Sequence, residues 1–338
     1  MSKELALWQF VAKQLKINEK VMLLVVVEST GSSPGRQGFK MAVNTGGGLC
    51  GSIGGGIMEI KLVELAKNFL KNSEDIPFLK KQIHHKNAPH DQSGMICSGE
   101  QTILFYTLLK EDLPTVRRIV YCLKNALPIV LKLTSHCFQV FENQKLIYPF
   151  YFISLDEMNF VFTENMGFKN ELYIIGGGHC ALALSELMSK MDFYIHLFDD
   201  RSDLNTLEKN RFVHQKHLVD YDDIGVHIPS GNNVYVVVMT VGYRTDALVL
   251  RQLLDKKVRY LGVLGSTAKM KILLKDLENQ DFTSDLLRGI HTPIGLNINS
   301  QTPEEIAVSI AAEIIGVKNN EIGFFRFGEF IKFPEPDI

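Results

Sequence analysis

The sequence has no long hydrophobic run and almost no net charge. Its longest apolar segments, residues 21–27 and 234–239, are far shorter than the roughly 18 residues that a membrane-spanning helix needs, and we expect both to be buried strands. The formal net charge is −2, with no block of like charge, which argues against a nucleic-acid-binding surface. We therefore expect neither a membrane nor a nucleic-acid partner, and favour a small ligand or a protein partner.

Cysteine is scarce as well. The chain has five cysteines and no CxxC pair, which argues against a disulfide framework and favours a reducing compartment. The N-terminus lacks the basic start, apolar stretch and small-residue cleavage site of an export signal. We expect a cytoplasmic protein in which any important thiol acts singly.

The length of the chain exceeds one ordinary domain. Residues 1–168 mix expected helices and strands, and residues 142–170 show no strong period, so we place a boundary at their end. Residues 169–320 alternate regularly between strands and helices, which predicts a doubly wound parallel sheet; residues 321–338 form a C-terminal extension. The predicted fold is α/β: an N-terminal mixed α/β domain followed by a Rossmann-like domain.

Hydrophobic periodicity predicts the individual elements. The expected helices are residues 3–17, a segment from 57, 112–125, 179–190, 245–256, 266–277 and 303–316, and the expected strands are residues 21–27, 101–109, 127–141, 172–176, 194–198, 234–240 and 258–264.

A glycine turn follows the first expected strand of the C-terminal domain. Gly176, Gly178 and Ala181 fit the pattern G-x-G-x-x-A, in which glycines let the backbone approach a pyrophosphate and a helix N-terminus supplies donors. Asp199 follows about 20 residues later, where a carboxylate accepts from ribose hydroxyls, and Arg201 would tolerate a phosphate there. The pattern predicts a site for NAD(P); a Rossmann scaffold that binds no dinucleotide is the alternative.

Two further strand ends belong to the same crevice, because parallel sheets present ligand-facing groups at the carboxyl ends of their strands. Thr240 ends one expected strand, and Ser266 follows another at a helix N-terminus. Tyr243, Arg244 and Asp246 are candidates beside Thr240, and Asp246 is equally well explained as a helix cap.

The N-terminal domain carries a second glycine-rich helix start. Its backbone N–H groups could form an anion nest, and glycines that serve only tight packing are an equal alternative. No Gly-Lys-Ser/Thr follows, so ATP hydrolysis is not expected. The candidate ligand-binding residues are Gly51, Ser52, Gly54, Gly55, Gly56 and Glu59.

Cys97 lies in a polar turn downstream of several histidines. With a depressed pKa it would act as a sulfur carrier, a nucleophile or a soft-metal ligand, whereas a lone cysteine is ordinarily a small buried hydrophobe. A zinc site in this segment would have ligand spacings that match no standard pattern. Its members would be His84, His85, His90, Asp91 and Cys97.

Several blocks of the chain form one known pattern when they are read together. They are residues 28–41, 51–59, 97–100, 176–181, 198–201, 262–266 with Lys269, 293–296 and 302–313. In these blocks the sequence resembles the XdhC/CoxI family of molybdenum-hydroxylase maturation factors, and residues 302–313 are the most specific single match.

The resemblance implies an accessory protein that binds the molybdenum cofactor (molybdopterin). Such a protein shields the cofactor during sulfuration by a cysteine desulfurase and delivers it to an apo molybdenum hydroxylase similar to xanthine dehydrogenase. It is a carrier without catalytic residues. A pterin phosphate needs an anion nest, and the metal or dithiolene could use a soft thiol. Cys97, a candidate metal ligand, therefore joins Gly99 and Glu100 among the cofactor-binding candidates, and a homodimer is the default assembly.

The sequence departs from the family at a few positions. Ile57 stands where members often carry His or Cys, Val241 and Tyr243 stand where they often carry histidines, and Ser98 replaces a glycine. These losses of polar groups allow a different ligand or partner.

We expect the ligand to lie between the loop from Ser52 to Glu59, the Cys97 turn and the Rossmann crevice. An NAD(P)-dependent oxidoreductase is the chief alternative, although Val241 and Gly242 stand where a general acid or base would be expected. A protein that recognises a hydroxylase without holding its cofactor is a third.

Overall fold

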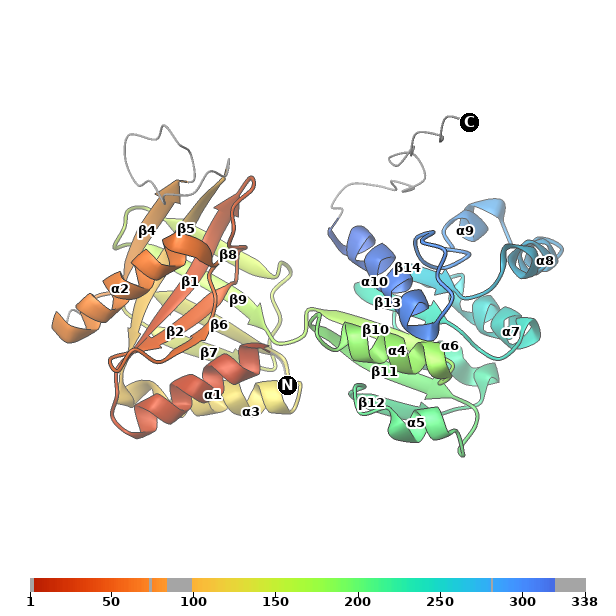
Figure 1. Cartoon of the computed structure of the whole chain (residues 1–338), viewed down its shortest axis with the longest axis horizontal. Coiled ribbons are helices and arrows are strands. Elements are labelled where there is room, and N and C mark those ends of the chain that lie inside the picture. The colour runs from red at the N-terminus through yellow and green to blue at the C-terminus, as the bar shows by residue number, and fades with distance from the viewer. Residues whose placement is uncertain (1–2, 73–74, 84–98, 281, 320–338) are drawn as a thin grey trace. The chain divides into compact units, whose positions relative to one another are not determined.

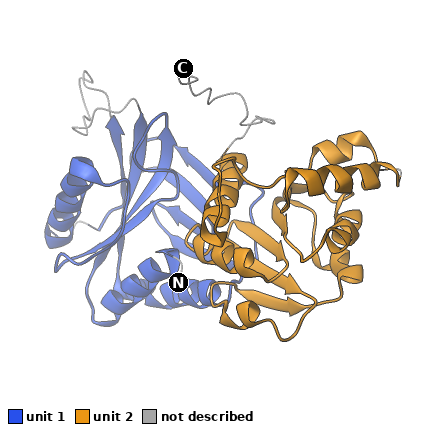
Figure 2. Cartoon of the chain, turned by 45° about the vertical axis from the view of Figure 1, so that its right-hand side comes forward, with its two compact units in different colours: residues 1–167 blue, residues 168–338 orange. Residues whose placement is uncertain are grey.

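The computed structural model describes residues 3–72, 75–83, 99–280 and 282–319. The chain divides into two compact units, residues 1–167 and residues 168–338 (Figure 2). The expected C-terminal extension, residues 321–338, lies outside the described residues.

A five-stranded antiparallel sheet forms the first part of the N-terminal unit, in the order β3-β2-β1-β5-β4. The central strand β1 is buried on both faces, which explains its continuous apolar run. Met22, Leu24 and Val26 pack beneath helix α2, whereas Leu23 and Val25 face a second core. The elements are β1 (Val21–Thr30), β2 (Lys40–Asn44), β3 (Leu49–Gly51), α2 (Gly56–Asn72), β4 (Phe78–Ile83) and β5 (Glu100–Leu108).

A four-stranded antiparallel sheet, in the order β7-β6-β9-β8, completes this unit (Figure 1). The second core is shared by both sheets and by helices α1 and α3, with Trp8 fully buried in it. The elements are α1 (Lys3–Lys16), the 3-10 turn η1 (Lys110–Asp112), α3 (Leu113–Lys124), β6 (Ile129–Thr134), β7 (Phe138–Glu142), β8 (Phe150–Ser154) and β9 (Phe160–Met166).

Residues 142–170 show no strong period in the sequence, yet the strands β8 and β9 lie in this stretch. A charged residue in the core hides the pattern of β9. Glu164 is buried and pairs with Lys40 of β2, with 2.6 Å between carboxylate and ammonium, and Glu4 of α1 accepts from the same ammonium at 3.0 Å. Burial lowers the pKa of Lys40, but the two carboxylates outweigh it and raise that pKa above its ordinary value. This cluster ties the two sheets to α1.

The C-terminal unit is built on a five-stranded parallel sheet in the order β12-β11-β10-β13-β14. Helices α4 and α10 cover one face of the sheet, and α6, α7 and α8 cover the other. This doubly wound arrangement confirms the predicted Rossmann-like fold. The strands are β10 (Asn170–Ile175), β11 (Phe193–Asp199), β12 (Gln215–Leu218), β13 (Gly231–Val238) and β14 (Val258–Val263). The helices are α4 (His179–Met188), α5 (Asn205–Lys209), the 3-10 turn η2 (Tyr221–Asp223), α6 (Ile224–His227), α7 (Tyr243–Leu253), α8 (Thr267–Glu278), α9 (Ser284–Arg288) and α10 (Pro303–Asn319).

Helix α10 begins where its start signals predict. Thr302 and Glu305 form reciprocal bonds, since the Glu305 N–H donates to the Thr302 hydroxyl and the Thr302 N–H donates to the Glu305 carboxylate. Further along the helix, Glu313 accepts from the Gly295 N–H at 2.8 Å and from the buried Tyr260 hydroxyl at 2.5 Å. The most specific sequence block therefore holds α10 against the sheet.

Candidate functional site

The crevice of the C-terminal unit begins where β10 and β13 end side by side. Gly176 has a φ of +105°, and a Cβ atom there would lie 2.3 Å from the Met239 carbonyl oxygen. Only glycine fits such a backbone contact. Gly176 is therefore needed to bring the two strand ends together, at the point where the strand order reverses and α/β proteins bind ligands.

Two helices start at this edge behind glycines that the fold itself does not need. Gly178 precedes α4 and Gly242 precedes α7, with φ of −71° and −148°, which any residue can adopt. A Cβ atom at either position would meet no described atom within 4 Å. Neither helix has a side-chain cap within the described chain. Both N-termini therefore keep backbone donors and open space, as an anion site requires.

The predicted ribose acceptor is fully committed within the protein. Asp199 is completely buried, and each of its carboxylate oxygens accepts two hydrogen bonds. One oxygen accepts from the Arg201 N–H and Nε, and the other from Arg201 Nη2 and the Gly177 N–H, at 2.6 to 2.9 Å. Burial raises the pKa of Asp199, but these hydrogen bonds outweigh it and lower that pKa below its ordinary value. Asp199 and Arg201 thus hold the glycine turn in place.

Thr240 and Ser266 belong to a polar cluster at the same edge. Asp246 is fully buried; it accepts from the Thr240 hydroxyl at 2.5 Å and from the Lys269 ammonium at 2.6 Å. Asp246 therefore does not cap α7, which begins earlier in the chain, behind Gly242. Ser266 caps α8 by accepting from the Lys269 N–H. Lys269 therefore joins the ends of β13 and β14. Its only signal in the sequence was its position beside the block 262–266.

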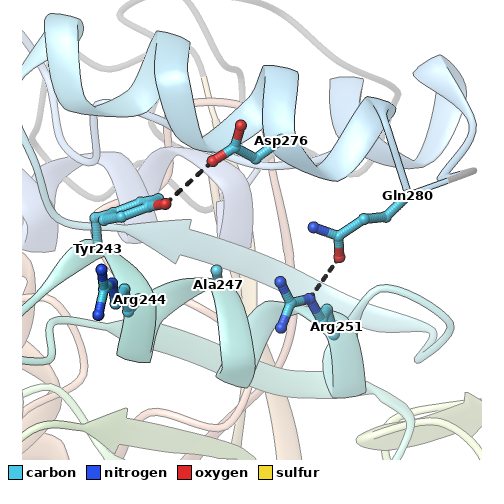
Figure 3. A pocket seen from close by; sticks show the side chains of 6 residues that line it. All are labelled: Tyr243, Arg244, Ala247, Arg251, Asp276 and Gln280. Carbon is cyan, nitrogen blue, oxygen red and sulfur yellow. Dashed lines mark hydrogen bonds between the residues drawn. The ribbon is translucent and has the colours of Figure 1, made fainter.

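Tyr243 and Arg244 line a groove of about 310 Å³ between α7 and α8 (Figure 3). The Tyr243 hydroxyl donates to Asp276 at 3.2 Å, and Arg251 Nε donates to Gln280 at 2.6 Å. Neither arginine has a carboxylate partner in the described part of the chain. The groove therefore offers the guanidinium group of Arg244 at the start of α7 and that of Arg251 in its last turn.

The glycine-rich loop of the N-terminal unit closes on its own carboxylate. Glu59 accepts from the Ser52 hydroxyl at 2.7 Å and from the N–H groups of Ile53 and Gly55 at 2.8 and 2.9 Å. All three donors meet one carboxylate oxygen. Gly54, Gly55 and Gly56 each have positive φ, which allows the turn. Of the predicted nest, the Ser52 hydroxyl and the N–H groups of Ile53 and Gly55 are therefore occupied by Glu59.

Three segments of this unit meet behind the loop. A Cβ atom at Gly54 would lie 2.7 Å from the Gly35 nitrogen, and one at Gly99 would lie 2.4 Å from the Ser33 nitrogen. Gln101, almost completely buried, accepts from the Ser33 hydroxyl and the Gly35 N–H at 2.8 and 3.0 Å. The blocks 28–41, 51–59 and 97–100 thus adjoin through these glycines. Sequence reasoning missed Gln101, because a glutamine within a strand carries no pattern of its own.

The remaining predicted site residues take different positions. Gly51, with positive φ, packs a hydrogen atom against the Lys40 carbonyl, Ala181 is buried in the core beside α10, and Glu100 forms an ion pair of 2.6 Å with Lys81. The departures from the family pattern, Ile57, Val241 and Tyr243, are all solvent-exposed.

The predicted thiol and the zinc candidates lie outside the described residues: His84, His85, His90, Asp91 and Cys97. Elsewhere in the described chain no group of three or more His, Cys, Asp or Glu side chains could hold a metal ion. None of the helices in the described ranges is long and apolar enough to cross a bilayer.

Two family profiles match the sequence. Residues 172–314 match the XdhC Rossmann domain, and residues 15–78 match the XdhC and CoxI family. Together the two profiles cover more than half of the chain.

Relatives match along most of the chain at low identity. An uncharacterized protein of Escherichia coli (strain K12), YqeB, is 24% identical over 303 residues, which are 88% of this chain and 43% of YqeB. The chain thus spans less than half the length of that relative. A protein of Bacillus subtilis (strain 168), named as a probable xanthine dehydrogenase subunit, is 23% identical over 327 residues, 89% of this chain and 94% of the relative.

A crystal structure described as a xanthine dehydrogenase from Bacillus halodurans has a similar fold. It superposes with a TM-score of 0.68 at 23% identity, and the match covers 95% of this chain and 97% of the other. The likeness extends over both units.

Proposed function

Because this chain belongs to the XdhC and CoxI family, we propose that it is an accessory factor that binds the molybdenum cofactor and supports its sulfuration and its insertion into a molybdenum hydroxylase of the xanthine dehydrogenase type. The observation that carries the proposal is the pair of open helix starts behind Gly178 and Gly242. An open glycine beside unused backbone donors suits a ligand whose phosphate approaches the main chain closely.

The donor groups around these helix starts fit the anionic end of the cofactor. The N–H groups at the start of α4, behind Gly178, would hold the phosphate, with Thr240 and Ser266 at the neighbouring strand ends and Arg244 beside them. When bound, the cofactor supplies the molybdenum and dithiolene that the client hydroxylase uses. The residues of this chain bind and shield it, and we propose no catalytic residue.

In the N-terminal unit we propose a different contribution. Since Glu59 already accepts from three donors of the loop that includes Ser52 and Gly55, we propose that this loop supports the shape of the surface. Cys97, with Gly99 and Glu100, is the proposed thiol contact for the metal or the dithiolene.

The proposed partners are a cysteine desulfurase, which supplies the sulfur, and an apo molybdenum hydroxylase, which receives the loaded cofactor. The name of the Bacillus subtilis relative, a probable xanthine dehydrogenase subunit, supports the second. A cytoplasmic homodimer is the proposed setting.

An NAD(P)-dependent oxidoreductase has less support. A ribose could reach Asp199 only if Arg201 left it, which would expose a buried carboxylate that now accepts four hydrogen bonds. The glycine turn therefore lacks the free acceptor that the dinucleotide pattern assumes.

The test is anaerobic binding by the full chain. Cofactor released from a molybdoenzyme is mixed with the purified protein, and molybdenum and pterin are assayed in the protein peak after gel filtration, with NAD(H) and NADP(H) tested in parallel. Near-stoichiometric molybdenum and pterin, without a dinucleotide effect, is the expected result. Tight dinucleotide binding without molybdenum would overturn the proposal.

The delivery step is tested separately. Loaded protein is incubated with an apo molybdenum hydroxylase of the xanthine dehydrogenase type, with and without a cysteine desulfurase and cysteine. We expect hydroxylase activity to depend on all three proteins. Equal activation by free cofactor alone would contradict the role as an insertion factor.

A further inference from the structure

Strand β8 differs from the other sheet edges of this protein. Edge strands expose backbone groups that can pair with another chain, and charged residues commonly block such pairing. Lys80 and Lys81 lie on β4, Glu142 on β7 and Arg259 on β14. Among the edge strands of five or more residues in the described chain, β8 alone has no charged residue.

One face of β8 is apolar and open to solvent. Tyr151 and Ile153 are 54% and 49% exposed, whereas Phe150 and Phe152 on the opposite face pack against the core. Both exposed side chains are of types that stabilise strand pairing when they face each other across two strands. The strand therefore presents an apolar surface directly beside an edge that carries no charged residue.

The hydrogen-bond pattern shows which backbone groups point outward. The Asn165 N–H donates to the Pro149 carbonyl, and the Leu155 N–H donates to the Asn159 carbonyl, so odd-numbered residues of β8 face β9. Because bonding alternates along an antiparallel pair, Phe152 and Ser154 direct their N–H and C=O groups away from β9. In the described chain no other strand pairs with them. Pro149, lacking an N–H, faces β9 and leaves the outer edge unblocked.

We propose that β8 pairs antiparallel with β8 of a second copy of this chain, with the twofold axis at Phe152. In this register the Phe152 N–H of each copy donates to the Phe152 carbonyl of the other. Tyr151 then lies directly opposite Ile153 of the second copy, on both sides of the axis. The register gives two aromatic to β-branched contacts on the exposed face, and the sheet continues through eight strands.

The charges that flank the strand fit this orientation. Lys145 precedes the strand and Asp156 and Glu157 follow it, and all three are exposed. Antiparallel pairing brings the beginning of one copy of β8 beside the end of the other. Lysine of one copy therefore approaches the acidic residues of its partner, whereas a parallel arrangement would place like charges together.

Five residues on each side make a small interface, below the roughly 1,200 Å² at which stable interfaces begin. The dimer is therefore weak and depends on protein concentration. Sedimentation equilibrium of the full chain over a range from low to high micromolar concentration tests this, and a monomer–dimer equilibrium is expected. Ile153→Lys, which places the blocking charge of the other edges on β8, raises the concentration at half-dimerisation at least about tenfold.

Ile272→Lys is the matched control. Ile272 is 59% exposed on α8 of the other unit, so this variant adds the same charge without touching β8 and leaves the equilibrium unchanged. Thermal melting verifies that both variants fold. A chain that stays monomeric at every concentration, or a dimer that Ile153→Lys does not weaken, overturns the proposal.

Amide hydrogen exchange locates the interface. The amides of Phe152 and Ser154 are expected to gain protection as the concentration rises. Protection that is independent of concentration and disappears when residues 320–338 are removed would assign the edge to the chain's own C-terminal segment and refute the pairing of two copies.

Discussion

The two glycine-rich helix starts of this protein look alike in sequence and differ in what their donors bind. In the N-terminal unit, the loop before α2 turns its N–H groups onto Glu59 of the same helix. In the C-terminal unit, the turn before α4 gives one N–H, that of Gly177, to Asp199, and the helix start behind Gly178 stays open. Density of glycine alone therefore does not identify an anion site.

The reason each glycine is present distinguishes the two regions better. Gly54 and Gly176 are required because a side chain would collide with backbone atoms. Gly178 is required by neither packing nor conformation, so the space beside it is available to a ligand. A glycine that the fold does not need is the more informative one.

The largest expected effect on stability comes from adding a side chain at Gly176, where the strands β10 and β13 end side by side. Gly176→Ala should lower the free energy of unfolding by on the order of 3 kcal/mol, because the added methyl group meets the Met239 carbonyl at 2.3 Å and φ is +105°. Urea unfolding measures the loss. An alanine variant as stable as the parent would contradict the account of this turn.

A smaller loss in the free energy of unfolding is expected when the Glu59 carboxylate is removed from the loop of the N-terminal unit. Glu59→Ala leaves the Ile53 and Gly55 N–H groups and the Ser52 hydroxyl without their acceptor, at a cost of about 1–3 kcal/mol. Glu59→Gln keeps an acceptor oxygen at the same position, so its free energy of unfolding should fall less than that of Glu59→Ala. If both variants unfold at the same urea concentration as the parent, the carboxylate does not organise the loop.

Gly178→Ala should separate binding from stability. We expect the free energy of unfolding to change by less than about 0.5 kcal/mol, because the methyl group enters open space, while cofactor retention falls about tenfold as that space is filled. Urea unfolding and the gel-filtration assay measure the two effects. Unchanged retention would remove Gly178 from the proposed site.

The C-terminal unit should lose stability in acid. Burial lowers the pKa of His214 and of His217 in the C-terminal unit, and in both cases the neighbouring His196 lowers it further. Because the folded pKa lies below the unfolded value of about 6.5, the unfolded state binds more protons in acid. Stability that is fully present above pH 6.5 is therefore lost as the pH falls from about 6.5 toward the folded pKa.

Melting at pH 7 and pH 5 checks this effect, which we expect to be the smallest. A lower midpoint at pH 5 is predicted, with His217→Gln reducing the difference. A midpoint that rises on acidification would show that the sign is wrong.

The sequence predicted the C-terminal fold well, because each buried parallel strand is an apolar run between glycine turns. It predicted the second sheet of the N-terminal unit poorly. The strand β9 contains Glu164, a charged residue that is buried only because Lys40, more than 120 positions earlier, neutralises it. Such a pairing is invisible to local periodicity.

The site residues likewise divide into those that the sequence identified and those whose partners it did not. Gly176 and Ser266 were identifiable from their positions at strand and helix ends. That Asp199 would be paired with Arg201 was not, because the motif specifies the carboxylate and leaves its partners open. The role of Glu59 as the loop's own acceptor likewise depends on geometry that spacing alone does not contain.

The most direct test of the central claim is amide hydrogen exchange of the full chain with and without the molybdenum cofactor, under anaerobic conditions. We predict new protection in the peptide that contains residues 178–182, at the start of α4, with little change in residues 52–59, where the N–H groups of residues 52–55 are already bonded within the chain. Protection confined to residues 52–59, or to neither peptide despite bound molybdenum, would contradict the account.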